Sequence, residues 1–186
     1  MLDQILQADR AALIFLNKLG SGFWDPLWLG ITNQKNWAPL FLFIIYLLFK
    51  TFGWKKAVFV LLVMIILVAF SDQFTNLIKN TFERLRPNRD PNINHLLRRI
   101  INPRGFSFMS GHATTSTFFT VFTILLFRKR YTYIYLMLIF PLVFAYSRLY
   151  LGVHFPIDIL TGFFIGTLLA CLYFKLYKQL DRKIFK

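Results

Sequence analysis

Acidic residues are scarce in this chain of 186 residues. Its 8 Asp and Glu stand against 22 Lys and Arg, which gives a formal net charge of +14. A soluble protein with this balance would be a candidate for nucleic-acid binding. The basic residues lie mainly between apolar runs, however, a distribution that fits membrane anchoring and an anionic ligand better than a DNA groove. We therefore expect no nucleic-acid partner.

Cysteine is almost absent, and the N-terminus has no leader pattern. The single Cys171 falls in an apolar run, which excludes a disulfide framework. Residues 1–10 lack a basic region followed by an apolar core, so we do not expect a cleavable signal peptide.

Apolar residues, in contrast, are abundant: 56% of the chain is hydrophobic, and Phe alone contributes 23 residues. One soluble core of this length could not bury so much apolar surface, so an integral membrane protein is predicted. A span needs about 20 residues. We predict an all-α integral membrane helical bundle with about five transmembrane helices, over residues 37–54, 57–78, 113–127, 131–152 and 156–177.

Two features within these runs predict local structure. Pro141 predicts a kink in the fourth run. In the fifth, the spacing Gly162-x-x-x-Gly166 permits close contact with another helix. Packing inside the bundle is favoured over a dimer face, and the oligomeric state stays open.

Residues 1–36 are too polar to span a membrane. Residues 2–18 have helical amphipathic spacing, and a second short helix is expected near Pro26, so this segment is predicted to lie in the interface. The predicted organisation is an interfacial segment over 1–36, a transmembrane domain over 37–178 with a site-bearing loop at 79–112, and a basic tail at 179–186.

The charge of the connections predicts the orientation. Short basic loops at 50–56 and 128–130 share one side with the basic tail, while the 79–112 connection and the 147–158 turn lie on the other. The positive-inside rule places the short basic loops in the cytoplasm. We expect a multi-pass protein of the inner (cytoplasmic) membrane whose polar cluster faces the periplasm or the extracellular side.

The unusual polar residues all fall on that outer side, at the ends of different spans. They are Lys79, Arg86, Ser110, Gly111, His112, Arg148, His154 and Asp158. Arginine and lysine donors suit a phosphate. Ser110 is a natural N-cap whose following N–H groups form an anion cradle, and Gly111 lets a ligand approach the backbone.

Two histidines complete a reaction scheme for this cradle. Pro156 fits a first helical position, so Asp158 falls in the first turn and can orient His154 as a nucleophile. His112 is placed to protonate a leaving oxygen. A nucleophile, its orienting acid, a proton donor and a basic cradle describe phosphoryl transfer without a metal or other cofactor.

Other charged residues have simpler interpretations. Asp72 and Lys79 share a helix face and are expected to form a structural ion pair. His95 is interpreted as an ordinary interfacial residue. Headgroup anchoring, or contact with the substrate headgroup, is expected for Arg84, Arg89, Arg98, Arg99 and Arg104.

Together, three motifs resemble the signature of the type 2 phosphatidic acid phosphatase family, also called lipid phosphate phosphatases. They are Lys79-x6-Arg86-Pro87, Ser110-Gly111-His112 and Ser147-Arg148-x5-His154-x3-Asp158. The second departs from the family pattern, because Met109 stands where Pro is usual. The resemblance implies a phosphohistidine at His154 oriented by Asp158, a general acid at His112, and phosphate binding by Lys79, Arg86, Ser110, Gly111 and Arg148.

The expected function is therefore hydrolysis of a lipid phosphate or pyrophosphate in the bilayer. Undecaprenyl pyrophosphate is slightly favoured on resemblance, with phosphatidylglycerol phosphate, phosphatidic acid and lipid A phosphate as alternatives. The competing classes are a non-enzymatic lipid-phosphate binder or flippase, a vanadate-dependent haloperoxidase-like site, and a transporter. Those haloperoxidases are soluble, and a transporter should carry mid-span charges, of which only Asp72 comes near.

Overall fold

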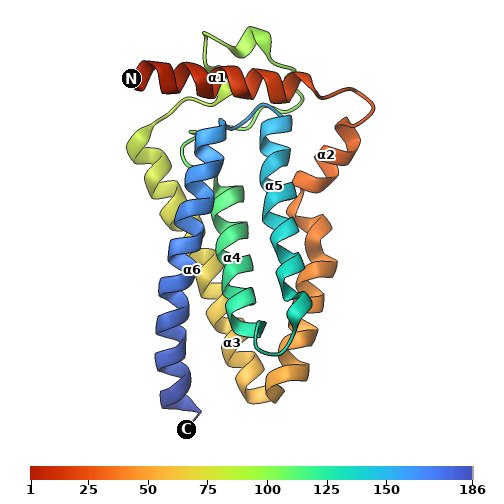
Figure 1. The fold of residues 1–186 in the computed structure, drawn as a ribbon, viewed down its shortest axis with the longest axis vertical. Coiled ribbons are helices and arrows are strands. Elements are labelled where there is room, and N and C mark those ends of the chain that lie inside the picture. The colour runs from red at the N-terminus through yellow and green to blue at the C-terminus, as the bar shows by residue number, and fades with distance from the viewer. Residues whose placement is uncertain (186) are drawn as a thin grey trace.

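The computed structural model describes residues 1–185, which form helices joined by turns and loops. Lys186, the last residue of the predicted tail, lies outside the described residues. The helices are α1 (Leu2–Lys18), α2 (Asp25–Thr32), η1 (Gln34–Trp37), α3 (Ala38–Phe82), η2 (Pro87–Arg89), η3 (Asn94–Leu96), α4 (Gly111–Phe127), η4 (Thr132–Leu138), α5 (Ile139–Tyr150) and α6 (Pro156–Ile184). Figure 1 shows α3–α6 running along the long axis, with α1 lying across one end.

Helix α3 contains the first two predicted spans. Gly53 has non-helical backbone angles, with φ 71°, a left-handed conformation that favours glycine. The chain reverses there, at the end of the bundle opposite α1 (Figure 1). The two arms of α3, α4, the η4–α5 pair and α6 occupy the positions of the five predicted passes. Among the described residues, three helical segments are long and apolar enough to cross a membrane, Gln34–Arg89, Thr132–Tyr150 and Pro156–Ile184, and α4 is a shorter apolar helix. The second arm continues to Phe82, so the site-bearing loop begins later than predicted.

The fourth pass is irregular just before Pro141, where a kink was predicted. The fourth pass begins as the 3₁₀-helix η4 and becomes α-helical at Ile139. Pro141 therefore lies in the first turn of α5, where a missing N–H breaks no helical hydrogen bond. The irregular stretch precedes the proline.

Helix α4 lies at the centre of the bundle and packs most closely on α6. A Cβ added to Gly162 would lie 2.8 Å from the Ala113 Cβ, and one added to Gly166 would lie 2.6 Å from the Thr114 carbonyl oxygen. Both glycines therefore face α4 inside the bundle, which confirms internal packing as the favoured interpretation of this motif. Hydrophobic association is weak inside lipid, so close backbone contact of this kind is what holds such helices together.

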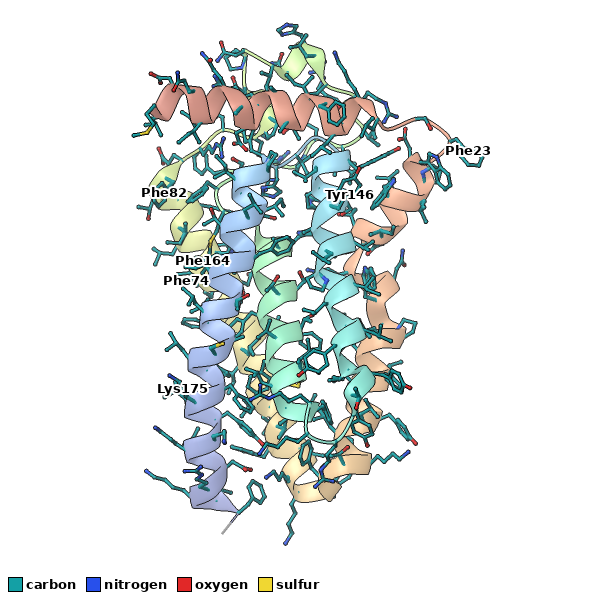
Figure 2. All side chains as sticks on the ribbon, in the orientation of Figure 1. Phe23, Phe74, Phe82, Tyr146, Phe164 and Lys175 are labelled. Carbon is teal, nitrogen blue, oxygen red and sulfur yellow. The ribbon has the colours of Figure 1, made fainter. Side chains whose placement is uncertain are left out.

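The outer surface of the bundle is apolar, as a lipid-facing surface should be. Phe82 and Phe164 are exposed and project outward from the helices (Figure 2). At the end opposite α1, helix α6 continues through most of the predicted tail, and Lys56 pairs with Asp181 at 2.6 Å. The predicted tail is thus mostly the last turns of α6.

The N-terminal segment lies on the end of the bundle without crossing it. Asn17 of α1 is fully buried and donates to the Tyr150 carbonyl at 2.7 Å, and it accepts from the Arg98 N–H at 2.8 Å. Leu2, Ile5 and Phe15 on the same helix remain exposed. Helix α1 therefore docks on the bundle and leaves apolar side chains exposed, and its position in the membrane interface stays a prediction.

Candidate active site

All eight predicted site residues lie at the α1 end of the bundle. Lys79 comes from the last turns of α3, Arg86 from the loop after it, and Ser110, Gly111 and His112 from the start of α4. Arg148 comes from the end of α5, and His154 and Asp158 flank the start of α6. The Ser110 N–H donates to the Asp158 carbonyl at 3.2 Å, which joins the starts of α4 and α6.

His154 and Asp158 form the predicted pair. The His154 Nδ1 lies 3.4 Å from the Asp158 Oδ2, and the Phe155 N–H donates to the same oxygen at 2.9 Å. Pro156 and Asp158 occupy the first turn of α6, where a carboxylate is stabilised by free backbone N–H groups. The local sequence therefore fixes the separation of the two side chains.

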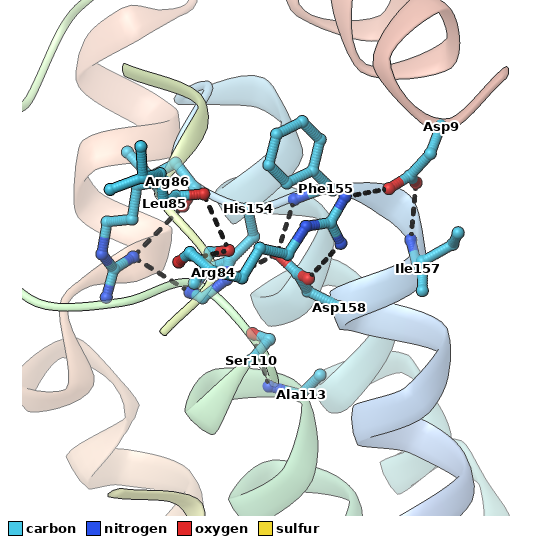
Figure 3. Close-up of polar contacts among 12 residues, drawn as sticks. Asp9, Arg84, Leu85, Arg86, Ser110, Ala113, His154, Phe155, Ile157 and Asp158 are labelled. Atoms are coloured by element: carbon cyan, nitrogen blue, oxygen red, sulfur yellow. Dashed lines mark hydrogen bonds and ion pairs between the residues drawn. The ribbon is translucent and has the colours of Figure 1, made fainter. Parts of the chain in front are cut away.

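Arg86 determines which nitrogen of His154 can react. Its Nη1 lies 3.2 Å from the His154 Nε2 and donates to the Val153 carbonyl at 3.1 Å (Figure 3). A guanidinium only donates, so Nε2 must accept and the ring proton belongs on Nδ1, facing Asp158. Burial, then the charges of Arg86, Arg148 and Lys79, hold the pKa of His154 well below its usual range. The imidazole is thus neutral, with its Nε2 lone pair directed at the basic cradle.

The cradle has donors that the protein itself leaves unused. Arg86 and Arg148 are both buried, and within the described residues neither Nε has a hydrogen-bond partner. A Cβ on Gly111 would lie 3.7 Å from the Lys79 ammonium, so the missing side chain leaves its space beside that cation. Buried unpaired donors are costly, and an anion with several oxygens would satisfy them.

Ser110 and His112 adopt the predicted positions at the start of α4. The Ser110 Oγ accepts from the Ala113 N–H at 3.4 Å, as an N-cap does (Figure 3). The His112 ring stacks on Phe144 with centroids 4.5 Å apart. No hydrogen bond between His112 and His154 occurs in the described part of the chain.

His112 also borders an apolar cavity of about 480 Å³. The cavity lies among both arms of α3, α4 and α5, and its lining includes Trp37, Ile44, Met64 and Phe119. The polar cradle thus opens directly onto an apolar space at membrane depth.

Three residues of the site were not predicted. Arg84 was interpreted as a headgroup contact, but its Nη1 lies 2.7 Å from the Asp158 Oδ1 and its Nη2 lies 2.6 Å from the Asp9 Oδ2 (Figure 3). Thr32 accepts from the Arg148 Nη1 at 2.6 Å. The proximity of Arg84 to Arg86 was a signal for the first, but Asp9 and Thr32 come from helices whose docking no local pattern reveals.

Two further predictions about charges are wrong. Arg98 is not a free anchor, because it binds Asp25 at 2.8 Å. Hydrogen bonds from Tyr150 and then Arg98 lower the pKa of Asp25. Asp72 accepts from Asn76 at 3.3 Å and forms no ion pair with Lys79 within residues 1–185. The Lys79 side chain instead turns toward Gly111.

A five-pass helical bundle with a histidine–aspartate pair and a basic cradle at its surface end defines a membrane phosphatase. Residues 56–182 match the model of the PAP2 superfamily, and the chain belongs to this family. The protein is accordingly a membrane lipid phosphatase.

Two curated relatives match almost the whole chain. The lipid A 4'-phosphatase of Bacteroides thetaiotaomicron is 34% identical, over 99% of this chain and 83% of its own. That of Porphyromonas gingivalis is 27% identical, over 95% of this chain and 75% of its own. The solved structure of a transmembrane PAP2-type phosphatidylglycerolphosphate phosphatase from Bacillus subtilis has a TM-score of 0.70 at 23% identity, covering 97% of this chain and 88% of that one. This likeness supports the fold.

Proposed function

We propose that this enzyme removes a phosphate monoester from a lipid A-type glycolipid through a phosphohistidine at His154. The observation that carries the proposal is the hydrogen-bond pattern of His154, whose Nδ1 faces Asp158 and whose Nε2 faces Arg86. This pattern supplies a neutral nucleophile aimed at an anion cradle.

The roles of the remaining site residues follow from their places around the cradle. The His154 Nε2 attacks phosphorus, and the bond from phosphorus to the lipid oxygen breaks while His112 donates its proton to that oxygen. Water then attacks the phosphohistidine, His112 takes a proton from it, and phosphate leaves. Throughout, Lys79, Arg86, Arg148 and the α4 N-terminus at Ser110 and Gly111 hold the phosphate oxygens. No metal or cofactor is required.

The cavity beside His112 supports a lipid leaving group. The proposed general acid His112 is part of its lining, and the rest of the lining is mainly apolar. A lipid chain can therefore stay at membrane depth while its phosphate reaches His154.

The choice of lipid rests on the relatives. Both curated relatives that cover nearly the whole chain are lipid A 4'-phosphatases. For that reason we favour a lipid A-type phosphate over undecaprenyl pyrophosphate, which the residues alone had not distinguished. Phosphatidylglycerol phosphate and phosphatidic acid are the other substrates to compare.

We also propose that the site lies on the outer face of the inner membrane. The short basic loop Arg128–Arg130, the turn at Gly53 and the end of α6 lie at the end of the bundle opposite α1 (Figure 1). The positive-inside rule places that end in the cytoplasm. A cysteine placed at exposed Asn92 should then react with a membrane-impermeant maleimide in spheroplasts, and protection there would contradict this orientation.

A phosphate-release panel tests the reaction. The four lipids are lipid A, phosphatidylglycerol phosphate, phosphatidic acid and undecaprenyl pyrophosphate, each in detergent with EDTA present. We expect the highest kcat/KM for lipid A and activity that survives EDTA; strict dependence on added metal would contradict the mechanism. His154→Gln should lower release by at least roughly 10³-fold. His95→Gln is the matched control, because His95 is exposed in the loop.

The His154→Gln variant also distinguishes a phosphatase from a non-enzymatic protein of the same fold. A lipid-phosphate binder or flippase built on this fold would show no phosphate release that depends on His154. Full phosphate release by His154→Gln, from every lipid of the panel, would exclude the phosphohistidine mechanism.

A further inference from the structure

The interfacial helix α1 reaches the active site through a buried carboxylate. The Asp9 side chain is 1% exposed, and its Oδ2 lies 2.6 Å from the Arg84 Nη2. Its other oxygen accepts from the Ile157 N–H at 2.9 Å, in the first turn of α6. Arg84 continues the chain, because its Nη1 lies 2.7 Å from the Asp158 Oδ1 (Figure 3). Charged contacts thus run from α1, through the loop after α3, to the residue that orients His154.

We propose that Arg84 and Asp9 are positioning residues, which hold the Asp158 carboxylate so that its Oδ2 stays on the His154 Nδ1. The proposal rests on the function proposed above for His154 and Asp158. Neither residue needs to touch the phosphate. Asp9 also lies outside the residues 56–182 that match the family model, so this chain supplies part of its active-site support from its N-terminal segment.

The two oxygens of Asp158 have separate partners. Oδ1 accepts from Arg84, whereas Oδ2 accepts from the Phe155 N–H and faces His154. A carboxylate held at both oxygens cannot rotate away from the imidazole. The Arg84 guanidinium lies 3.9 Å from the centroid of the Phe155 ring and is only 21% exposed, so it is itself held in place.

The same contacts support the hydrogen bond between His154 and Asp158. The other charged groups around His154 are Lys79 of α3, Arg86 of the loop and Arg148 of α5. Asp158 is the anion in this set, and Arg84 balances its charge. Without that cation, the buried carboxylate would lose its counter-charge and the contact that keeps its Oδ2 on the His154 Nδ1.

A second ion pair provides the matched control. Arg10, the residue after Asp9, binds Asp90 of the same loop at 3.0 Å. This pair also docks α1 onto the loop, but neither of its residues contacts Asp158. Arg10→Gln therefore reports what loss of docking alone does, whereas Asp9→Asn and Arg84→Gln also disturb Asp158.

The kinetic experiment uses the full-length protein in detergent, with lipid A and with para-nitrophenyl phosphate. We expect Arg84→Gln to lower kcat by roughly 100-fold, since small misplacements of a catalytic group have effects of this size. Asp9→Asn should lower kcat about tenfold. KM should stay within about twofold in both, because the cradle is intact. Arg84→Lys should recover part of the loss, because it keeps the charge, and Arg10→Gln should match the wild type.

A measurement without turnover separates this proposal from the proposed function. The His154 ring N–H is recorded by ¹H–¹⁵N NMR near neutral pH, and its signal is assigned by its absence from the His154→Gln spectrum. We expect the Nδ1–H proton signal to shift upfield in Arg84→Gln, because its hydrogen bond to Asp158 is weakened, and not in Arg10→Gln. An unchanged Nδ1–H signal in Arg84→Gln would overturn the proposal even if no phosphate ester were hydrolysed. Equal losses of kcat in Asp9→Asn and Arg10→Gln would show that Asp9 only docks α1, and this result would also overturn the proposal. Wild-type turnover in Arg84→Gln, alongside an inactive His154→Gln, would overturn the positioning role and leave the phosphatase intact.

Discussion

At the scale of single residues, chemistry depends on which donors remain free. Contacts between distant segments fix the ring of His154 and hold both oxygens of Asp158. Within the described residues, the same packing leaves the Nε atoms of Arg86 and Arg148 without a partner. The motif residues themselves could be found from the sequence, because their types and spacing define the chemistry. The residues that hold them, Asp9 and Thr32, carry no such pattern.

The lowered pKa of His154 predicts how stability depends on pH. In the unfolded chain this residue has an ordinary pKa of about 6.5, whereas burial and the surrounding cations keep it neutral in the fold. The unfolded state therefore binds one more proton below that pH. The contribution of His154 to the free energy of unfolding is fully present above about pH 6.5. Below that pH, the free energy of unfolding falls by roughly 1.4 kcal/mol per pH unit. Thermal unfolding in detergent between pH 7.5 and 5 checks this.

His154→Gln is the control for that measurement, since all other titrating groups are retained. We expect its melting temperature to fall less steeply with decreasing pH than that of the wild type. Parallel curves for the two proteins would show that His154 binds its proton equally in both states.

Thr32 is predicted to support phosphate binding through Arg148. Its hydroxyl accepts from the Arg148 Nη1 at 2.6 Å, and a hydrogen bond to a charged group is worth roughly 1.5–3 kcal/mol. Thr32→Val should release Arg148 and raise KM by about tenfold or more, with a smaller change in kcat. Thr32→Ser keeps the hydroxyl and should behave as the wild type. Steady-state kinetics on one lipid substrate would distinguish these outcomes. If Thr32→Ser raised KM as much as Thr32→Val, the effect would come from packing and not from the hydroxyl.

At the scale of elements, the sequence predicted what depends on local composition. The apolar runs gave the number of passes, and Pro156 with Asp158 gave the start of α6. The errors lie where one helix meets another. Asp72 accepts from Asn76 and does not pair with Lys79, whose ammonium lies beside Gly111 of α4. Such outcomes depend on tertiary packing, which competes with local preference.

Contact between α4 and α6 is predicted to depend on Gly166. A Cβ at this position would lie 2.6 Å from a backbone oxygen of Thr114, which cannot move without shifting α4. Gly166→Ala gains helix propensity of up to about 1 kcal/mol, but overpacking costs roughly 1–3 kcal/mol. We expect a net loss of stability, measured as a lower melting temperature in detergent. Gly22→Ala, with nothing within 4 Å of the added Cβ, should leave it unchanged.

At the scale of the whole molecule, the bundle combines a polar end with an apolar interior that opens beside it. The bundle and the positions of the motifs could be anticipated, because membrane thickness restricts the arrangement of spans. The cavity could not be anticipated, because residues from both arms of α3, from α4 and from α5 line it together.

This cavity is predicted to select substrates by their lipid chains. Ala69 lines it, and Ala69→Trp would fill part of its volume of about 480 Å³. We expect a higher KM for a long-chain lipid phosphate and an unchanged KM for para-nitrophenyl phosphate, because only the former needs the apolar space. Leu62→Trp is the matched control on the same arm of α3, where Leu62 is 54% exposed on the outer surface. Equal effects of Ala69→Trp on both substrates, or none on either, would remove the cavity from substrate binding and place the lipid chains elsewhere along the bundle.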